Sequence, residues 1–130
     1  MKYIALGLSL MAFASPSFAD TFRSFTGLKV TATGTNRYVV SGVPNYGPAD
    51  YWCTIGDYAQ RILRVDPDSR IYVVGDYKRG QRTYTFSTSP EGTAAASGPV
   101  ASSSTRVDGA SRRANAAKAE CYSRRAISNR

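Results

Sequence analysis

The sequence predicts one α+β domain, in which a small antiparallel sheet of about four strands carries two helices on one face. Two observations lead to this class. Short segments rich in β-branched and aromatic residues occur in two pairs, and turn-forming residues separate the members of each pair. Each pair is followed by a segment whose apolar or small residues recur at helical spacing. Hairpins that alternate with helices favour an antiparallel sheet, so the expected order is ββ-α-ββ-α.

The first hairpin and the first helix come from the early part of the domain. Residues 28–33 alternate apolar and polar side chains, and residues 37–41 follow a Gly-Thr-Asn turn, so the two segments are expected to pair. A helix is expected over residues 49–63, because Pro48 suits the first helical position. Asp50 adds a negative charge at the positive end of the helix dipole.

The second hairpin and the second helix follow. Residues 71–74 are β-branched and aromatic, and residues 82–88 alternate tyrosine or phenylalanine with threonine and serine. Residues 89–104 are rich in proline, glycine, alanine and serine, so we expect a flexible loop there. Residues 100–107, which overlap the end of that loop, are a candidate for a short edge strand. A basic C-terminal helix is expected over residues 109–125.

A stripe of small residues marks one face of the C-terminal helix. The stripe consists of Ala110, Ala114, Ala117 and Cys121. Such a narrow face allows a helix to lie close to its support. Gly56, inside the first helix, costs about 1 kcal/mol relative to alanine, so we expect it to admit the close approach of another element. The stripe is therefore expected to dock beside Gly56.

The N-terminus has the pattern of a cleaved signal peptide. Lys2 precedes an apolar run that is too short to span a bilayer, and Ser17 and Ala19 supply the small residues of a cleavage site. Residues 1–19 are therefore expected to be removed, which leaves residues 20–130 as a single domain. The short charged region is typical of bacteria, so the expected location is the periplasm or the medium. No later segment is apolar enough to be a transmembrane helix.

Two cysteines, Cys53 and Cys121, lie in the exported part of the chain. An even number of cysteines in an oxidising compartment predicts one disulfide between them. The alternative is a reactive Cys53 thiolate near the start of a helix, but the sequence offers no histidine as its base.

The chain contains no histidine. This composition excludes Ser-His-Asp and Cys-His nucleophilic systems, and it excludes zinc or haem sites that need imidazole. Cysteines held in a disulfide cannot supply thiolate ligands either. We therefore expect no cofactor, no metal ion and no enzymatic activity of the common kinds.

Aspartates are the remaining candidates for acid–base chemistry. Asp66 and Asp68 are interpreted as a turn, because a calcium loop would need an oxygen ligand and a glycine that are missing from the following positions. The tripeptide Gly-Asp-Tyr occurs twice, around Asp57 and Asp76, once in a predicted helix and once at a strand end, which indicates a chance match. Asp57 and Arg61 have the i,i+4 spacing of a helical ion pair.

Positive charge is concentrated towards the C-terminus. The chain carries 17 Lys and Arg against 9 Asp and Glu, a net charge of +8. The possible binding residues on the predicted last helix are Arg112, Arg113, Lys118, Arg124 and Arg125. Such a surface suits an anionic envelope component, whereas a solvated face that keeps the protein soluble is the simpler interpretation. Nucleic acid is not an expected partner, given the compartment and the absence of a recognisable motif.

Aromatic residues supply a second group of candidates. Tyrosine and arginine are enriched at recognition surfaces, and Tyr46 and Tyr51 flank Pro48 in a position where they could form a contact patch. The alternative is that each ring packs against the sheet with its hydroxyl in water. Phe22 and Phe25 precede the first strand and are expected to tuck into the core.

Part of the chain resembles a group of uncharacterised small exported alphaproteobacterial proteins. The resemblance lies in Tyr-Trp-Cys-Thr-Ile-Gly-Asp-Tyr-Ala-Gln-Arg at residues 51–61 and in Ser-Arg-Ile-Tyr at residues 69–72. The shared pattern is an aromatic-Trp-Cys-x-x-Gly-Asp-Tyr helix, an Arg-Ile-Tyr strand and a later cysteine. It covers roughly the middle third of the exported chain and implies export and a disulfide, but it carries no activity.

The predicted function is a non-enzymatic exported domain, periplasmic or secreted, that binds a protein or an envelope component. One alternative is an inhibitor of an envelope hydrolase such as a lysozyme-like enzyme, carried by a protruding loop at residues 43–48. A second alternative is a carboxylate-dependent enzyme. A cleft holding two carboxylates of raised pKa would favour the enzyme, a flat patch of tyrosine and arginine would favour binding, and a rigid convex loop would favour inhibition.

Overall fold

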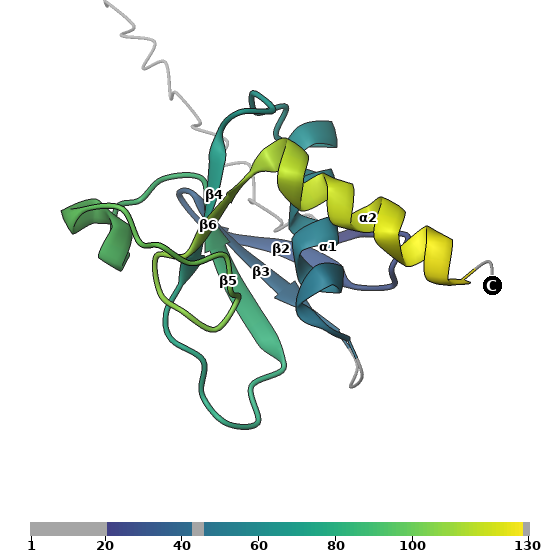
Figure 1. Ribbon diagram of the computed structural model, residues 1–130, viewed down its shortest axis with the longest axis horizontal. Helices are drawn as coiled ribbons and strands as arrows, with labels where there is room; N and C mark the ends of the chain where they lie inside the picture. The colour runs from purple at the N-terminus through teal and green to yellow at the C-terminus, as the bar shows by residue number, and fades with distance from the viewer. Residues whose placement is uncertain (1–20, 43–45, 129–130) are drawn as a thin grey trace, which may run out of the picture.

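The computed structural model describes residues 21–42 and 46–128, with side chains described as far as Tyr122 (Figure 1). The predicted signal peptide at residues 1–19 lies outside the described residues, as do residues 43–45. Within the described residues the elements are β1 (Thr21–Arg23), β2 (Lys29–Gly34), β3 (Arg37–Ser41), α1 (Pro48–Arg61), β4 (Arg70–Val74), β5 (Thr83–Ser87), the 3-10 turn η1 (Ala94–Ser97), β6 (Ser111–Arg113) and α2 (Ala114–Ser128).

The predicted α+β class is confirmed. Every pair of neighbouring strands is antiparallel, and the strand order is β1-β2-β3-β5-β4-β6. The two predicted hairpins are β2–β3 and β4–β5, and they meet through β3 and β5, where Val40 lies opposite Tyr84. Asn36 ends the first turn with a φ of 56°, a left-handed conformation that asparagine tolerates better than most residues.

Two short edge strands extend the sheet beyond the four that the sequence predicts. β1 pairs with β2 through Phe22 and Val30, in a segment that shows no strand pattern. β6 pairs with β4 through Arg112 and Ile71, although a helix was expected from residue 109. A strand of three residues has too few side chains to show a periodicity. It forms because the neighbouring strand presents N–H and C=O groups that need partners.

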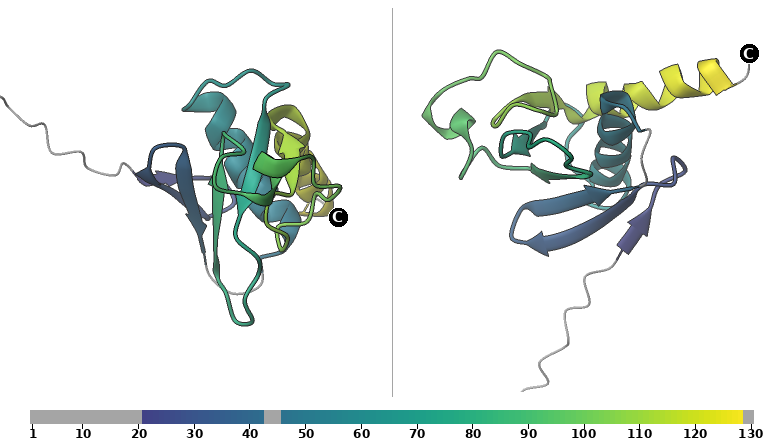
Figure 2. Two further views of the ribbon diagram at one scale, coloured as in Figure 1. Left: turned by 90° about the vertical axis from the view of Figure 1, so that its left-hand side faces the viewer. Right: turned by 90° about the horizontal axis from the view of Figure 1, so that it is seen from below.

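The core lies between the sheet and α1. Figure 2 shows α1 lying between strands β1–β3 and α2, so the helices are stacked on one side of the sheet. Trp52 is the largest fully buried side chain, and its ring centroid lies 5.3 Å from that of Phe86. The other fully or nearly fully buried apolar side chains from the strands and α1 are Val30, Val40, Ile55, Ala59, Ile71 and Val73. This contact of one helical face with the inward side chains of the strands is what the periodicity predicts.

Helix α2 packs directly on α1 at the predicted contact. A Cβ added at Gly56 would lie 2.4 Å from the backbone nitrogen of Lys118 and 2.9 Å from the Cβ of Ala117. The expected role of Gly56 is therefore confirmed. Cys53 and Cys121 form the predicted disulfide on the same contact, with their Cα atoms 4.7 Å apart. The whole small-residue stripe is buried, although Ala110 precedes β6 and does not belong to the helix.

The segment of residues 89–104 has defined contacts with the rest of the domain. The Trp52 indole N–H donates a hydrogen bond of 2.9 Å to the carbonyl oxygen of Ser103. The Asp108 carboxylate accepts two backbone N–H groups, one from the end of β4 at 2.8 Å and one from η1 at 3.0 Å. Residues 100–107 form no strand, contrary to the expected edge strand. Side-chain and backbone hydrogen bonds, which composition does not reveal, hold this glycine- and serine-rich segment.

Candidate functional site

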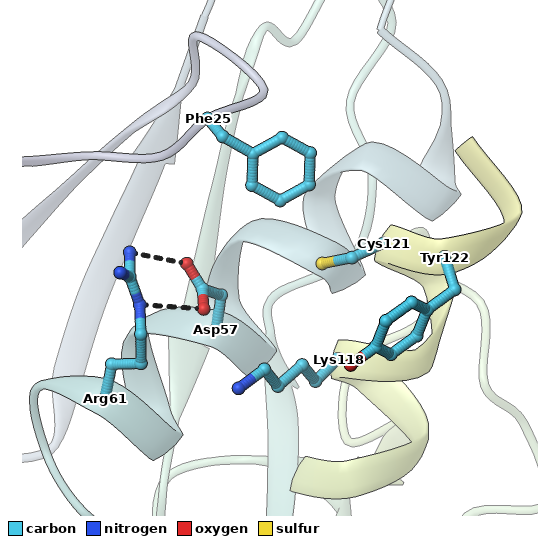
Figure 3. A pocket seen from close by; sticks show the side chains of 6 residues that line it. All are labelled: Phe25, Asp57, Arg61, Lys118, Cys121 and Tyr122. Atoms are coloured by element: carbon cyan, nitrogen blue, oxygen red, sulfur yellow. Dashed lines mark hydrogen bonds and ion pairs between the residues drawn. The ribbon is translucent and has the colours of Figure 1, made fainter. Parts of the chain in front are cut away.

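A pocket of about 330 Å³ lies where α1, α2 and the loop between β1 and β2 meet (Figure 3). Two aromatic rings, three charged side chains and one half of the disulfide line it. We call it the aromatic–cationic pocket, and its residues are Phe25, Asp57, Arg61, Lys118, Cys121 and Tyr122. Its residues come from segments far apart in the sequence, so the site depends on the packing of the two helices.

Asp57 and Arg61 form the predicted ion pair on α1. Two guanidinium nitrogens, Nε and Nη2, each approach a carboxylate oxygen at 2.9 Å, which is a bidentate geometry. The Asp57 side chain is 8 % exposed and that of Arg61 is 55 % exposed. The guanidinium also lies 5.2 Å from the ring centroid of Phe22. The pair is therefore held in place, and a buried carboxylate is satisfied by its neighbour one helical turn away.

Phe25 and Tyr122 are large apolar side chains that stay in contact with water. Phe25 is 51 % exposed and Tyr122 is 63 % exposed. The expectation that Phe25 tucks into the core is wrong, whereas Phe22 does pack against the core. Figure 3 shows the two rings on different sides of the pocket, with Asp57 and Lys118 between them and below.

Short polar contacts fix the loop that carries Phe25. The Thr26 and Thr54 hydroxyls lie 2.9 Å apart, which ties the loop to α1. The Ser24 N–H donates to the Leu28 carbonyl at 2.9 Å and closes the loop on itself. With the loop held on both sides, the ring of Phe25 remains at the pocket instead of joining the core.

The predicted basic cluster is divided by the structure. Arg112 and Arg113 lie in β6 and not in a helix, which corrects their predicted outward position on one helical face. Arg112 forms an ion pair with Glu120, and its guanidinium lies 5.5 Å from the ring centroid of Trp52. Lys118 lines the aromatic–cationic pocket.

Two members of the predicted cluster, Arg124 and Arg125, belong to α2, but their side chains lie outside the described part of the chain. Arg112 is half-buried, because it forms an ion pair with Glu120 and lies over the ring of Trp52. Arg113 is exposed on the edge strand β6. The cluster is therefore not one continuous helical surface.

The predicted contact patch around Pro48 is also corrected. Tyr51 is 6 % exposed, and its ring centroid lies 4.4 Å from that of Tyr84. The Tyr51 hydroxyl donates to the Arg82 carbonyl at 3.3 Å. Tyr46 is half-buried, and its hydroxyl donates to the Thr26 carbonyl at 2.6 Å. Tyr51 packs inward because its position in α1 places it against Tyr84 of β5, and Tyr46 is held by its hydrogen bond to the loop between β1 and β2.

We expect the buried tyrosines to make the fold sensitive to alkali. Burial raises the pKa of Tyr51 and Tyr84 above the ordinary value of 10.0, and each phenolate would repel a neighbouring one. Because the pKa of each tyrosine is raised in the folded state, the unfolded state ionises first as the pH rises. The contribution of the neutral tyrosines to the free energy of unfolding is therefore fully present below pH 10.0 and is lost as the pH rises above it. Urea unfolding at increasing pH measures this fall. Tyr51→Phe should make the fall shallower, and an unchanged slope would contradict the assignment.

A second pocket, of about 630 Å³, lies between β4, β6 and the segment around η1. Its polar side chains include Arg70, Tyr72 and Ser111, and the Arg70 guanidinium donates to the Ser111 hydroxyl at 3.0 Å. Neither of the two pockets contains a pair of carboxylates. Asp66 accepts the Asp68 N–H at 2.8 Å, so the predicted turn is confirmed.

No family model matches the chain, and comparison with the curated proteins and with the solved structures finds no significant match. In the described residues, no helix is long and apolar enough to cross a membrane. The same residues contain no group of three or more histidine, cysteine, aspartate or glutamate side chains that could hold a metal ion. The loop at residues 43–48 lies partly outside the described residues, so the inhibitor alternative stays a prediction.

The sequence predicts some features of the pocket, but it does not predict that they lie together in one pocket. It predicted the Asp57–Arg61 pair, the cysteine pairing and the docking of α2, and it named Lys118 as a possible binding residue. It missed Phe25 and Tyr122. An available signal was that Tyr122 follows the last residue of the buried stripe and therefore leaves the helix on another face.

Proposed function

We propose that this chain is an exported, non-enzymatic binding domain of the bacterial envelope, and that the aromatic–cationic pocket contacts its partner. The observation that carries the proposal is the exposure of Phe25 and Tyr122, 51 % and 63 %, beside a pocket lined by two cations. Exposed aromatic rings cost free energy in water and are enriched, with arginine, at the centres of protein interfaces. The absence of histidine and the predicted signal peptide support the non-enzymatic and exported parts of the proposal.

The rigidity of the pocket supports the same function. The disulfide and the Gly56 contact hold α2 against α1, while the Thr26–Thr54 contact holds the loop. A preformed site loses little conformational entropy when a partner binds. The positive charge of the pocket also suits an anionic partner.

The experiment is a pull-down from periplasmic extract with the exported chain as bait. Phe25→Ala and Tyr122→Ala should each abolish or strongly reduce the capture of a specific component. The matched control is Ile62→Ala, because Ile62 is 52 % exposed but does not line the pocket. A second comparison pairs Lys118→Gln with Lys78→Gln, which removes an exposed charge elsewhere. Melting temperatures near wild type should show that each variant is folded.

Equal capture by all variants would contradict the proposal, because the partner would then bind another surface. Release of the component by Ile62→Ala as strongly as by Phe25→Ala would also contradict it. Loss restricted to the pocket variants is the supporting result.

A further inference from the structure

The charges of the aromatic–cationic pocket do not balance. Asp57 contributes one negative charge, and Arg61 and Lys118 contribute two positive charges. Arg61 uses Nε and Nη2 to satisfy Asp57, and Figure 3 shows its third nitrogen on the side away from Asp57. The Lys118 ammonium group has no ion-pair partner among the described side chains. Within the described residues, the pocket therefore offers one unpaired cation, the Lys118 ammonium group, for a ligand with one negative charge.

The two aromatic rings lie on different sides of the pocket, with charged groups between them (Figure 3). Figure 3 shows the Phe25 ring on one side, the Asp57–Arg61 pair and the Lys118 ammonium group on another, and Tyr122 beside Lys118. This arrangement suits a ligand that carries an anion beside an apolar group, with the anion at Lys118 and the apolar group against the neighbouring rings (Figure 3). The volume of about 330 Å³ is at the small end of the range of ligand pockets, which suits one large side chain.

The lining also argues against a sugar or a phosphate monoester. Sugar recognition needs several neutral donors and acceptors, and the only neutral hydroxyl among the lining side chains is that of Tyr122. A phosphate monoester carries close to two negative charges at neutral pH, and one of them would face the Asp57 carboxylate without compensation. A carboxylate carries a single charge and matches the excess of the pocket.

We propose that the aromatic–cationic pocket binds a monocarboxylate attached to a large apolar or aromatic group, the chemistry of a free peptide C-terminus. Lys118 Nζ holds the carboxylate, and Phe25 and Tyr122 cover the apolar group. The inference rests on the proposed function and names the ligand class of the same site. A small free aromatic acid shares this chemistry with a peptide terminus.

The experiment uses four probes in NMR titrations of the isotope-labelled exported chain. N-acetylphenylalanine has both features, N-acetylphenylalaninamide lacks the charge, and N-acetylalanine lacks the ring. Glucuronate places the same charge on a sugar. N-acetylphenylalanine should shift the backbone amides of residues 57–61 and 117–122. Its affinity should exceed that of N-acetylalanine roughly twofold to tenfold, the range for aromatic contacts, and that of the amide by up to about fivefold, the range for exposed ion pairs.

Variants assign each preference to a side chain. Phe25→Ala should remove the preference for phenylalanine over alanine and keep the preference for the acid over the amide. Lys118→Gln should do the reverse, and Lys78→Gln should change neither preference. These ratios compare two probes on one variant, so a general loss of structure cannot imitate the pattern.

A fifth probe, 3-phenylpropionate, lacks the peptide amide and therefore distinguishes a peptide C-terminus from a free aromatic acid. Weaker binding than N-acetylphenylalanine supports a peptide terminus, and equal binding supports a free aromatic acid. Stronger binding of glucuronate, or no shift with any probe, would overturn the ligand class. The pull-down would still report on the proposed function, because its dependence on Phe25 and Tyr122 does not require a carboxylate.

Discussion

Cys53→Ala should lower the free energy of unfolding by about 2–5 kcal/mol, the range for removing a native disulfide from a small exported domain. The bond joins residues 68 positions apart, so its loss frees a large part of the unfolded chain. Urea unfolding measured by circular dichroism gives the midpoint and the slope. The slope should rise in the variant, because an unfolded chain without the cross-link exposes more surface.

The reduced wild-type protein is the matched control for this variant. If the cross-link is responsible, reduction should destabilise the protein by a similar amount, and Cys53→Ala/Cys121→Ala should resemble both. A reducing agent should have no effect on the double variant. An unchanged midpoint after reduction, or the recovery of two free thiols from the exported protein, would contradict the prediction.

Gly56→Ala should destabilise the fold by about 1–3 kcal/mol, the usual cost of an overpacked contact. Helix propensity has the opposite sign, since alanine is favoured over glycine by about 1 kcal/mol inside a helix. We expect packing to win, because the new methyl group would lie 2.4 Å from the backbone nitrogen of Lys118 and 2.8 Å from the carbonyl carbon of Ala117. Backbone atoms cannot rotate away, so α2 as a whole would have to move.

Gly34→Ala is the control, because a Cβ at Gly34 would meet no atom within 4 Å. Its effect should stay within about 0.5 kcal/mol, as for most surface substitutions. The disulfide holds α2 close to α1, so Gly56→Ala should cost less in the Cys53→Ala/Cys121→Ala background than in wild type. This coupling is measured as a double-mutant cycle. Stabilisation by Gly56→Ala in wild type would show that the helices are less closely packed than the structure indicates.

The longer elements could be predicted from local sequence because each contains its own signal. The α1 face of Trp52, Ile55 and Ala59 repeats at helical spacing, and it is the face that meets the sheet. The β4 strand alternates between the buried Ile71 and Val73 and the more exposed residues between them. Such patterns reflect burial on one side of an element, which local periodicity records directly.

The candidate site could be predicted only in pieces. The Asp57–Arg61 pair lies within one helix and follows from its i,i+4 spacing. Phe25 comes from a loop more than thirty residues away in sequence from Asp57, and its exposure depends on the hydrogen bond that ties that loop to α1. An apolar residue just before a strand is usually predicted to be buried in the core, and no local pattern around Phe25 indicates otherwise.

The sequence by itself determined the α+β class and the two hairpins, because periodicity and composition carry this information locally. It also predicted the pairing of the cysteines, because only two are present, and the close contact at Gly56, because a glycine inside a helix indicates the approach of another element. Only the tertiary structure decided that residues 111–113 form a strand and that Arg112 forms a partly buried ion pair with Glu120. It also decided that Phe25, Lys118 and Tyr122 share one pocket. The physical reason is the same in each case: edge pairing, ion pairing and pocket formation depend on groups that are distant in sequence and become neighbours only when the helices and sheet have packed.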